Sequence, residues 1–171
     1  WPKGNETWNL CTKIPLENSD GNIIGLIGFG RDITKDKRRE KLIWQQSNYD
    51  ALTGLPNRNF FVGSLNSSIY EANAGHRYTL LGLDIDRFKS FNDSYGHGCG
   101  DAILVHVAQC IQNNVSDKDI VARVGSDEFL LLIDNQSNKT NIVDLAIKLR
   151  TDIQEPFFYQ NQRYDITCCL G

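Results

Sequence analysis

The sequence predicts an α/β fold in which helices cover a central mixed sheet, and three observations support this class. Apolar residues recur at helical spacing in some segments and form short continuous runs, typical of buried strands, in others. Turn residues join two of these runs into a hairpin, which excludes a purely parallel sheet. The 171 residues are 40% hydrophobic and 23% charged, the composition of a chain that folds. This length accommodates one domain of ordinary size and a further fragment.

The first part of the chain predicts two strands joined by a tight turn. The runs at 7–15 and 22–32 suit strands, and Asp20-Gly21 between them favours a hairpin, because glycine accepts the positive φ of the turn. A lone hairpin is marginal in water, so we expect it to close a larger sheet. The runs contain the motifs WNLCTKIP, GNIIG and GRDIT. In these motifs the segment resembles the last strands of PAS sensory domains. The alternative interpretation is an arbitrary terminal hairpin.

A connector helix is expected next. Thr34 can cap a helix that begins at Lys35 and continues to Tyr49, since a threonine hydroxyl can accept a free amide of the first turn. Basic residues here alternate with Asp36 and Glu40, which indicates a solvated helix face. We therefore expect three parts: the end of a PAS-like sensory domain at 1–34, a signalling linker helix at 35–49, and the main domain at 50–171.

The main domain alternates helices and strands. Three sets of apolar residues have helical spacing: Phe61, Leu65, Ile69 and Ala72; Ile103, Leu104, Val107, Ala108 and Ile111; and Ile142, Ala146, Leu149 and Ile153. Continuous runs predict strands at 78–85, 120–124, 129–133 and 164–169. The run at 78–85 suits a strand buried on both faces. The short turn between the second and third runs predicts a hairpin.

Acidic residues stand where two of these strands end. Asp84 and Asp86 close the long apolar run, while Asp127 and Glu128 follow Gly125 in the hairpin turn. Ionised groups beside an apolar strand are costly unless they are paired or bind a metal. If the strands are neighbours, the carboxylates form a hard-oxygen site for Mg²⁺ or Mn²⁺ with phosphate as a further ligand, suited to phosphoryl transfer. The alternative is that Asp127 and Glu128 are ordinary turn residues and that Asp86 caps the next turn.

Four separate sequence motifs of the main domain agree with one family in identity and order: DALTGLPNR (50–58), DIDRFKSFNDSYGHGCGDAIL (84–104), ARVGSDEF (122–129) and ITCCLG (166–171). In these motifs the main domain resembles the GGDEF family of diguanylate cyclases. The resemblance implies a palm-like nucleotide-cyclase fold and the condensation of two GTP into cyclic di-GMP and pyrophosphate. It also implies a homodimer, because each protomer holds one GTP, with the linker helix transmitting control from the upstream sensor.

The resemblance implies a set of ion ligands and catalytic residues. Asp84, Asp127 and Glu128, with the carbonyl of Ile85, would bind Mg²⁺ or Mn²⁺. Glu128 would help to hold a second ion or activate the 3′-hydroxyl. Lys89 would offset the negative charge that develops in the transition state. Asp127, Glu128 and Lys89 are therefore the expected catalytic residues.

The same resemblance implies a set of GTP-binding residues: Arg87, Phe88, Asn92, Asp101, Leu104, Gly125 and Ser126. Amides near Arg87 and Phe88 would cradle the terminal phosphates. Asn92 and Asp101 would bind the guanine edge, and Leu104 would lie against the face of the base. Guanine offers two adjacent hydrogen-bond donors to a carboxylate, whereas adenine offers no such pair, so we expect the site to bind GTP in preference to ATP.

The sequence also departs from the family. Ser126 stands where the family has a second glycine; if that position needs φ > 0, the serine costs on the order of 1 kcal/mol and its Cβ crowds the nucleotide. At 116–119 the arginine of the product-inhibition site is missing, so that site is not expected to act. The chain stops at Gly171, before the family's last strand and helix, and we expect the domain to be incomplete there.

Residues 155–171 resemble GGDEF domains that precede an EAL phosphodiesterase domain. The alternative function is therefore a catalytically weak GTP-binding domain that regulates an attached EAL cyclic di-GMP phosphodiesterase.

Composition narrows the partners. The net charge of −3 argues against a nucleic-acid partner, which would require clustered basic residues. The five cysteines have no metal-binding spacing and suit the reduced thiols of a cytoplasmic protein. The apolar stretch at 23–29 is far shorter than the about 20 residues that span a bilayer, so no membrane segment is expected in this chain. Arg58 and Arg123 are expected to be ion-pair anchors.

Overall fold

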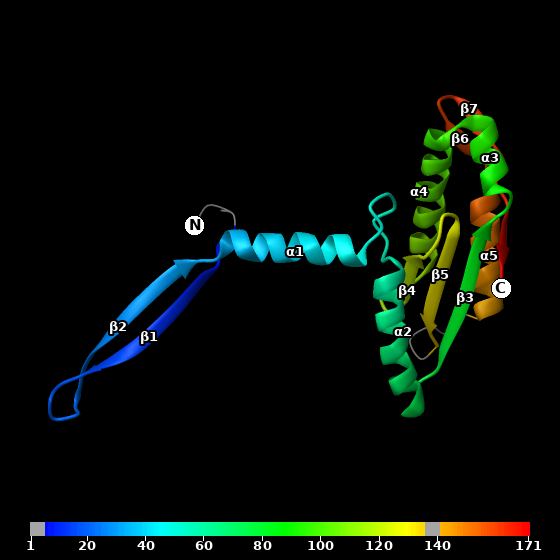
Figure 1. Cartoon of the computed structure of the whole chain (residues 1–171). Helices are drawn as coiled ribbons and strands as arrows, with labels where there is room; N and C mark the ends of the chain where they lie inside the picture. Colours follow the sequence, from blue (N-terminus) through cyan, green and yellow to red (C-terminus); the bar gives the residue numbers. More distant parts are fainter. Residues whose placement is uncertain (1–5, 136–140) are drawn as a thin grey trace. The chain divides into compact units, whose positions relative to one another are not determined.

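A computed structural model describes residues 6–135 and 141–171 of the chain. The chain divides into two compact units, one that ends at Gln45 and one that begins at Gln46, and each is described by itself. Figure 1 labels the helices and strands. None of the helices in the described ranges is both long enough and apolar enough to cross a membrane.

The first unit contains the predicted hairpin. Strands β1 (Asn9–Glu17) and β2 (Ile23–Asp32) pair in antiparallel register. The side chain of Asn18 accepts the amides of Asp20 and Asn22 at 3.0 and 2.9 Å, and Gly21 has φ +78, so the predicted turn is confirmed. Every residue of β1 and nearly every residue of β2 is exposed. The hairpin therefore buries no core of its own.

Helix α1 (Thr34–Asn48) begins differently from the prediction. The hydroxyl of Thr34 accepts a hydrogen bond from the amide of Trp8 at 2.8 Å, while the amide of Thr34 donates one to the carboxylate of Asp32 at 2.8 Å. The predicted cap by Thr34 is therefore wrong, because its hydroxyl instead joins the helix start to the residue before β1.

The second unit is built on a four-stranded sheet with the order β4-β5-β3-β8. Its strands are β3 (Tyr78–Ile85), β4 (Ile120–Arg123), β5 (Glu128–Asp134) and β8 (Cys168–Leu170). Every ladder in it is antiparallel, and parallel pairing among the described residues is confined to an isolated bridge between Asn57 and Arg123. The predicted α/β class is confirmed, but the sheet is not mixed. Strands β3 and β4 run parallel, yet β5 lies between them and pairs antiparallel with both.

The helices of this unit are α2 (Arg58–Asn73), α3 (Phe88–Tyr95), α4 (His97–Asn114) and α5 (Ile142–Gln154). The three predicted from helical spacing are confirmed, and α3 is an addition. A small hairpin follows α5, formed by β6 (Phe157–Tyr159) and β7 (Gln162–Tyr164). The single strand predicted at 164–169 is therefore wrong: the run divides between β7 and β8, and Thr167 between them bonds to Asp86.

Most of the core lies between the sheet and helices α4 and α5. Leu83 and Ile85 of β3 point into it and are 2% and 3% exposed. Leu80, on the opposite face of β3, is 49% exposed. The prediction that this strand is buried on both faces is wrong, because α2 packs Phe61 against Ala122 of β4 and leaves Leu80 uncovered.

Candidate active site

Acidic residues meet across the sheet where β3 ends. Asp84 of β3 is the register partner of Glu128 at the start of β5, and the amide of Ile85 donates to the carbonyl of Asp127 at 3.4 Å. On its other side Asp84 pairs with Cys169 of β8. Directly opposed residues share one face of a sheet, so Glu128, Asp84 and Cys169 form a row. The structure therefore brings the acidic turn to the end of the long strand, as predicted.

The charges in this row repel one another. Partial burial, and then the charges of Asp127, Glu128 and Asp86, raise the pKa of Asp84 above its ordinary value. Carboxylates and a backbone carbonyl are the donors that Mg²⁺ and Mn²⁺ prefer, so both donor chemistry and charge fit a divalent ion. Within residues 6–135 and 141–171, no three acidic, histidine or cysteine side chains already lie close enough together to hold one.

Asp86 has a structural role. Its carboxylate accepts the hydroxyl of Thr167 at 2.6 Å and the thiol of Cys169 at 3.1 Å, and these bonds lower the pKa of Asp86. The alternative that Asp86 caps the next turn is therefore wrong, because its oxygens bond to β8 and the segment before it.

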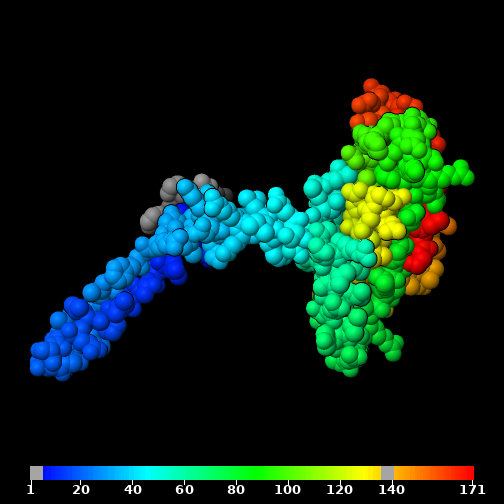
Figure 2. Space-filling view, in the orientation of Figure 1, coloured from blue at the N-terminus to red at the C-terminus, as the bar shows by residue number. Residues whose placement is uncertain are grey.

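The turn that precedes β5 accommodates a serine without left-handed strain. Positive φ at non-glycine residues in the described ranges occurs at Arg87, Gln160 and Asn161, so Ser126 avoids the expected cost. Its hydroxyl instead donates to the carboxylate of Asp127. Gly125 leaves room for the side chain of Glu128, because a Cβ there would lie 2.7 Å from Oε2 of Glu128 and 3.2 Å from its Cβ. In Figure 2 the yellow residues of this region reach the surface.

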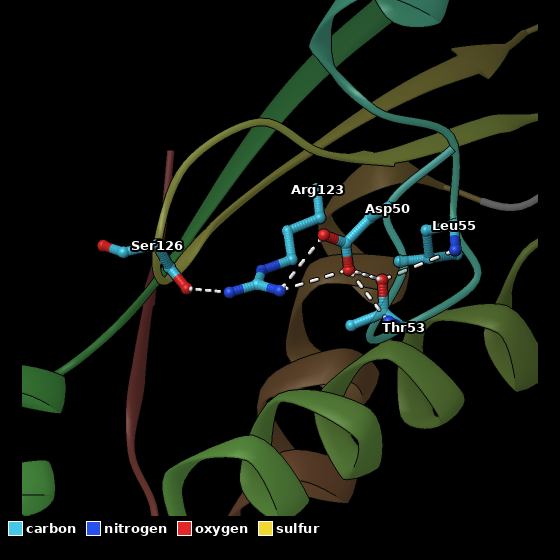
Figure 3. A network of polar contacts seen from close by, with 5 residues as sticks. All are labelled: Asp50, Thr53, Leu55, Arg123 and Ser126. Atoms are coloured by element: carbon cyan, nitrogen blue, oxygen red, sulfur yellow. Dashed lines mark hydrogen bonds and ion pairs between the residues drawn. The ribbon is translucent and has the colours of Figure 1, made fainter. Parts of the chain in front are cut away.

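A polar network links this turn to the start of the main domain (Figure 3). Arg123 donates to both carboxylate oxygens of Asp50, at 3.1 and 3.3 Å, and to the carbonyl of Ser126 at 2.7 Å. The Arg123 and Asp50 side chains are only 13% and 23% exposed. Burial alone would raise the pKa of Asp50, but bonds from Thr53 and Arg123 outweigh it and lower that pKa. The prediction that Arg123 is an ion-pair anchor is confirmed.

Arg58 lies elsewhere than expected. It takes no part in the ion pairs of the described residues, so it is not the anchor that we predicted. Instead it lines a cavity of about 590 Å³ together with Asp84 and Glu128. Sequence reasoning missed this cation beside the acidic row, and its position in the first turn of a helix after DALTGLPN was the only available signal.

The segment after β3 offers backbone donors. Arg87 precedes α3 with φ 56 and ψ 28, a left-handed conformation that non-glycine residues adopt at a cost, and no side chain caps the helix. The first amides of a helix have no partners within it, so those of Phe88 and Lys89 can bind an anion. Phe88 is 6% exposed and anchors the segment in the core, whereas Lys89 is exposed.

An unpaired acceptor lies between α3 and α4. Oδ1 of Asn92 is buried without a hydrogen-bond partner among the described residues. A Cβ on Gly100 would lie only 1.8 Å from that oxygen, so glycine makes the arrangement possible. Asp101, next in α4, is exposed. Leu104 is 2% exposed and belongs to the core, so it can contribute only the floor beneath these two acceptors.

Comparison with known sequences identifies relatives. Residues 47–171 match the family described as "Diguanylate cyclase, GGDEF domain". The chain is 34% identical over 158 residues to a diguanylate cyclase of Vibrio cholerae, covering 91% of this chain and 48% of that protein. It is also 34% identical over 169 residues to the cyclic di-GMP phosphodiesterase PdeR of Escherichia coli, covering 99% and 25%. The chain therefore spans between a quarter and a half of these two relatives.

Comparison with solved structures gives similar folds. The coiled coil and GGDEF domain of DgcB from Caulobacter crescentus, in complex with c-di-GMP, has a TM-score of 0.74 at 26% identity, covering 81% of this chain and 75% of that one. The GGDEF domain of TpbB (YfiN) from Pseudomonas aeruginosa has a TM-score of 0.67 at 34% identity, covering 72% and 73%.

Proposed function

Because the chain belongs to the GGDEF domain family of diguanylate cyclases, we propose that it condenses two GTP molecules into cyclic di-GMP and pyrophosphate. One observation carries this proposal. Asp84 lies opposite Glu128, with Asp127 beside them, at the strand end that leads into the uncapped start of α3. This arrangement combines ion ligands with donors for phosphate.

The acidic row would hold the divalent ion. Asp84, Asp127 and Glu128 supply carboxylates, and Ile85 supplies a carbonyl. A bound Mg²⁺ or Mn²⁺ would neutralise phosphate charge and lower the pKa of a coordinated hydroxyl. Burial, and then the charges of the neighbouring carboxylates, raise the pKa of Asp84; the repulsion among these carboxylates supports the assignment, because a cation relieves it.

The segment around α3 would bind the nucleotide. The amides of Phe88 and Lys89 and the Lys89 ammonium can bind the phosphate oxygens of a nucleotide. Asn92 and Asp101 can accept the N1 and N2 protons of guanine. The unpaired Oδ1 of Asn92 supports this role, because a buried acceptor without a partner is costly until a ligand supplies a donor.

The reaction requires two protomers. The 3′-oxygen of each GTP forms a bond to the α-phosphorus of the other, while the bond to the leaving pyrophosphate breaks, and Glu128 is the candidate acceptor of the 3′ proton. Since one site holds one GTP, we propose a homodimer. Helix α1 would set the relative position of the two catalytic domains.

The test is product formation. The chain, at concentrations that favour dimers, is incubated with GTP and Mg²⁺, and cyclic di-GMP is measured by mass spectrometry. We expect product from GTP, no cyclic dinucleotide from ATP, and a large loss of product in Glu128→Gln. A matched control is Glu155→Gln, which alters an acidic residue at the end of α5. GTP binding without product would contradict the cyclase proposal.

A second candidate function has specific support. Ser126 departs from the family's paired glycines, and the chain is similar to a cyclic di-GMP phosphodiesterase, PdeR. The chain would then bind GTP and regulate an attached EAL phosphodiesterase domain. In a longer protein that carries such a domain, this alternative predicts that GTP changes phosphodiesterase activity and that Asn92→Ala abolishes the change.

We also propose the division of labour along the chain: residues 1–34 as the end of a PAS-like sensory domain, 35–49 as the signalling linker and 50–171 as the catalytic domain of a cytoplasmic protein. The unit boundary after Gln45 supports the separation of sensor and catalyst. All five cysteines are free thiols, which supports a reducing compartment.

A further inference from the structure

We propose that Ser126 is a positioning residue for the ion site, because its hydroxyl is the last link of a polar relay that runs from Asp50 through Arg123 and orients the carboxylate of Asp127. This inference rests on the proposed function, in which Asp127 is an ion ligand. It assigns a positive role to the residue by which the chain departs from its family.

The relay begins at a fixed point. Oδ1 of Asp50 accepts the amide of Thr53 at 2.8 Å and its hydroxyl at 2.6 Å, so the carboxylate is held before Arg123 reaches it. Arg123 then donates to the same carboxylate at 3.1 Å. Both partners are largely buried, and this fixes the plane of the guanidinium.

The guanidinium continues the relay into the turn. Its second terminal nitrogen donates to the carbonyl of Ser126 at 2.7 Å, which fixes the backbone there (Figure 3). The Ser126 hydroxyl in turn donates to Oδ1 of Asp127. A glycine at position 126 could accept the bond from Arg123 but has no hydroxyl for Asp127.

The last bond matters because ion ligands depend on the groups behind them. Hydrogen bonds to a ligating carboxylate fix its orientation, and their loss typically weakens ion binding about 10- to 100-fold. This one hydrogen bond leaves Oδ2 of Asp127 and the remaining lone pair of Oδ1 available to an ion. The backbone already holds Asp127 next to its expected co-ligand, because the carbonyl of Asp127 accepts a hydrogen bond from the amide of Ile85, the residue after Asp84, at 3.4 Å.

The test is Mn²⁺ affinity in the complete chain without nucleotide, measured by electron paramagnetic resonance. We expect Ser126→Ala and Ser126→Gly to bind Mn²⁺ about tenfold more weakly than wild type. Ser126→Thr keeps the hydroxyl and is expected to stay within about threefold. The control is Ser94→Ala, which removes an exposed hydroxyl that donates to the carbonyl of Ser90, one helical turn earlier in α3. Thermal unfolding confirms that each variant is folded.

The outcomes separate the inference from the proposed function. If wild type binds Mn²⁺ and Asp127→Asn weakens it, but the alanine and glycine variants equal wild type or bind more tightly, the positioning role is overturned while the ion site stands. If only glycine alters affinity, the Cβ rather than the hydroxyl matters, and the inference is again overturned. If Asp127→Asn has no effect, the proposed ion site itself fails, and the positioning role fails with it.

A double-mutant cycle tests the continuity of the relay. In an Arg123→Gln background the carbonyl of Ser126 loses its fixed donor, so the hydroxyl no longer has a defined position. We expect Ser126→Ala to cost less than about threefold in that background, because coupled residues do not act additively. A full tenfold effect there would overturn the relay.

Discussion

Gly100→Ala is expected to weaken GTP binding without unfolding the protein. The added Cβ would lie 1.8 Å from Oδ1 of Asn92 and 2.9 Å from its Cγ, so the Asn92 side chain must rotate away. The displaced group is the end of a side chain rather than backbone, and the fold can absorb the change. What is lost is the position of the acceptor that we assign to guanine.

The substitution is expected to change GTP affinity more than the stability of the fold. Alanine is more favourable than glycine inside a helix by about 1 kcal/mol, which offsets the cost of moving Asn92, so the free energy of unfolding should change by less than about 1 kcal/mol. Loss of one hydrogen bond to a partly buried acceptor removes roughly 1.4 kcal/mol of binding free energy, equivalent to about tenfold in Kd.

Gly98→Ala is the matched control. It lies in the same first turn of α4, and its added Cβ would meet only the hydroxyl of Tyr159, at an ordinary distance of 3.6 Å. Calorimetric titration with GTP should give a tenfold weaker Kd for Gly100→Ala and an unchanged Kd for Gly98→Ala. Equal GTP affinity in wild type, Gly100→Ala and Asn92→Ala would refute the reasoning, because Asn92 would then not contact the base.

Three further predictions concern stability. Asp84→Asn should stabilise the ion-free protein by roughly 0.5 kcal/mol and so raise its melting temperature, because the change removes one of several like charges at the surface. A lower melting temperature would contradict the repulsion. Arg123→Met should cost about 3 kcal/mol in urea unfolding, since Asp50 is left partly buried without its ion pair, and a cost below about 0.5 kcal/mol would mean that the pair is unimportant. The folded-state pKa of Asp50 is lowered, so the stability that its carboxylate contributes is complete above the unfolded-state pKa of about 3.9 and is lost as pH falls through the folded-state pKa. The free energy of urea unfolding, measured between about pH 2 and 6, should therefore depend less steeply on pH in Asp50→Asn than in wild type. Identical slopes in the two proteins would refute this.

Periodicity predicted the parts of the fold that rest on long apolar patterns. Helices α2, α4 and α5 and the hairpin of β4 and β5 follow directly from spacing. Helix α3 was missed although Phe88, Phe91 and Tyr95 have helical spacing, because the helix is only eight residues long and shows the repeat over two turns alone. The antiparallel sheet was missed because strand order depends on long-range pairing, and no local pattern encodes it.

The sequence supplied candidate residues for the site but not their geometry. Motifs identified Asp84 and Glu128, but only the register of β3 and β5 makes them neighbours. The roles of Ser126 and Gly100 depend on local dihedral angles and on a close side-chain approach, which the sequence does not specify. Spacing alone could not locate Arg58 beside the acidic row, because its position depends on how α2 packs against the sheet.

Anomalous diffraction from Mn²⁺ in crystals of the chain grown with GTP tests most directly whether the carboxylates of β3 and the acidic turn share an ion. We predict a peak within about 2.2 Å of an oxygen of Asp84 and of an oxygen of Asp127 or Glu128, with phosphate oxygens completing the coordination. An ordered Mn²⁺·GTP complex bound elsewhere, with Asp84 out of contact, would contradict the account.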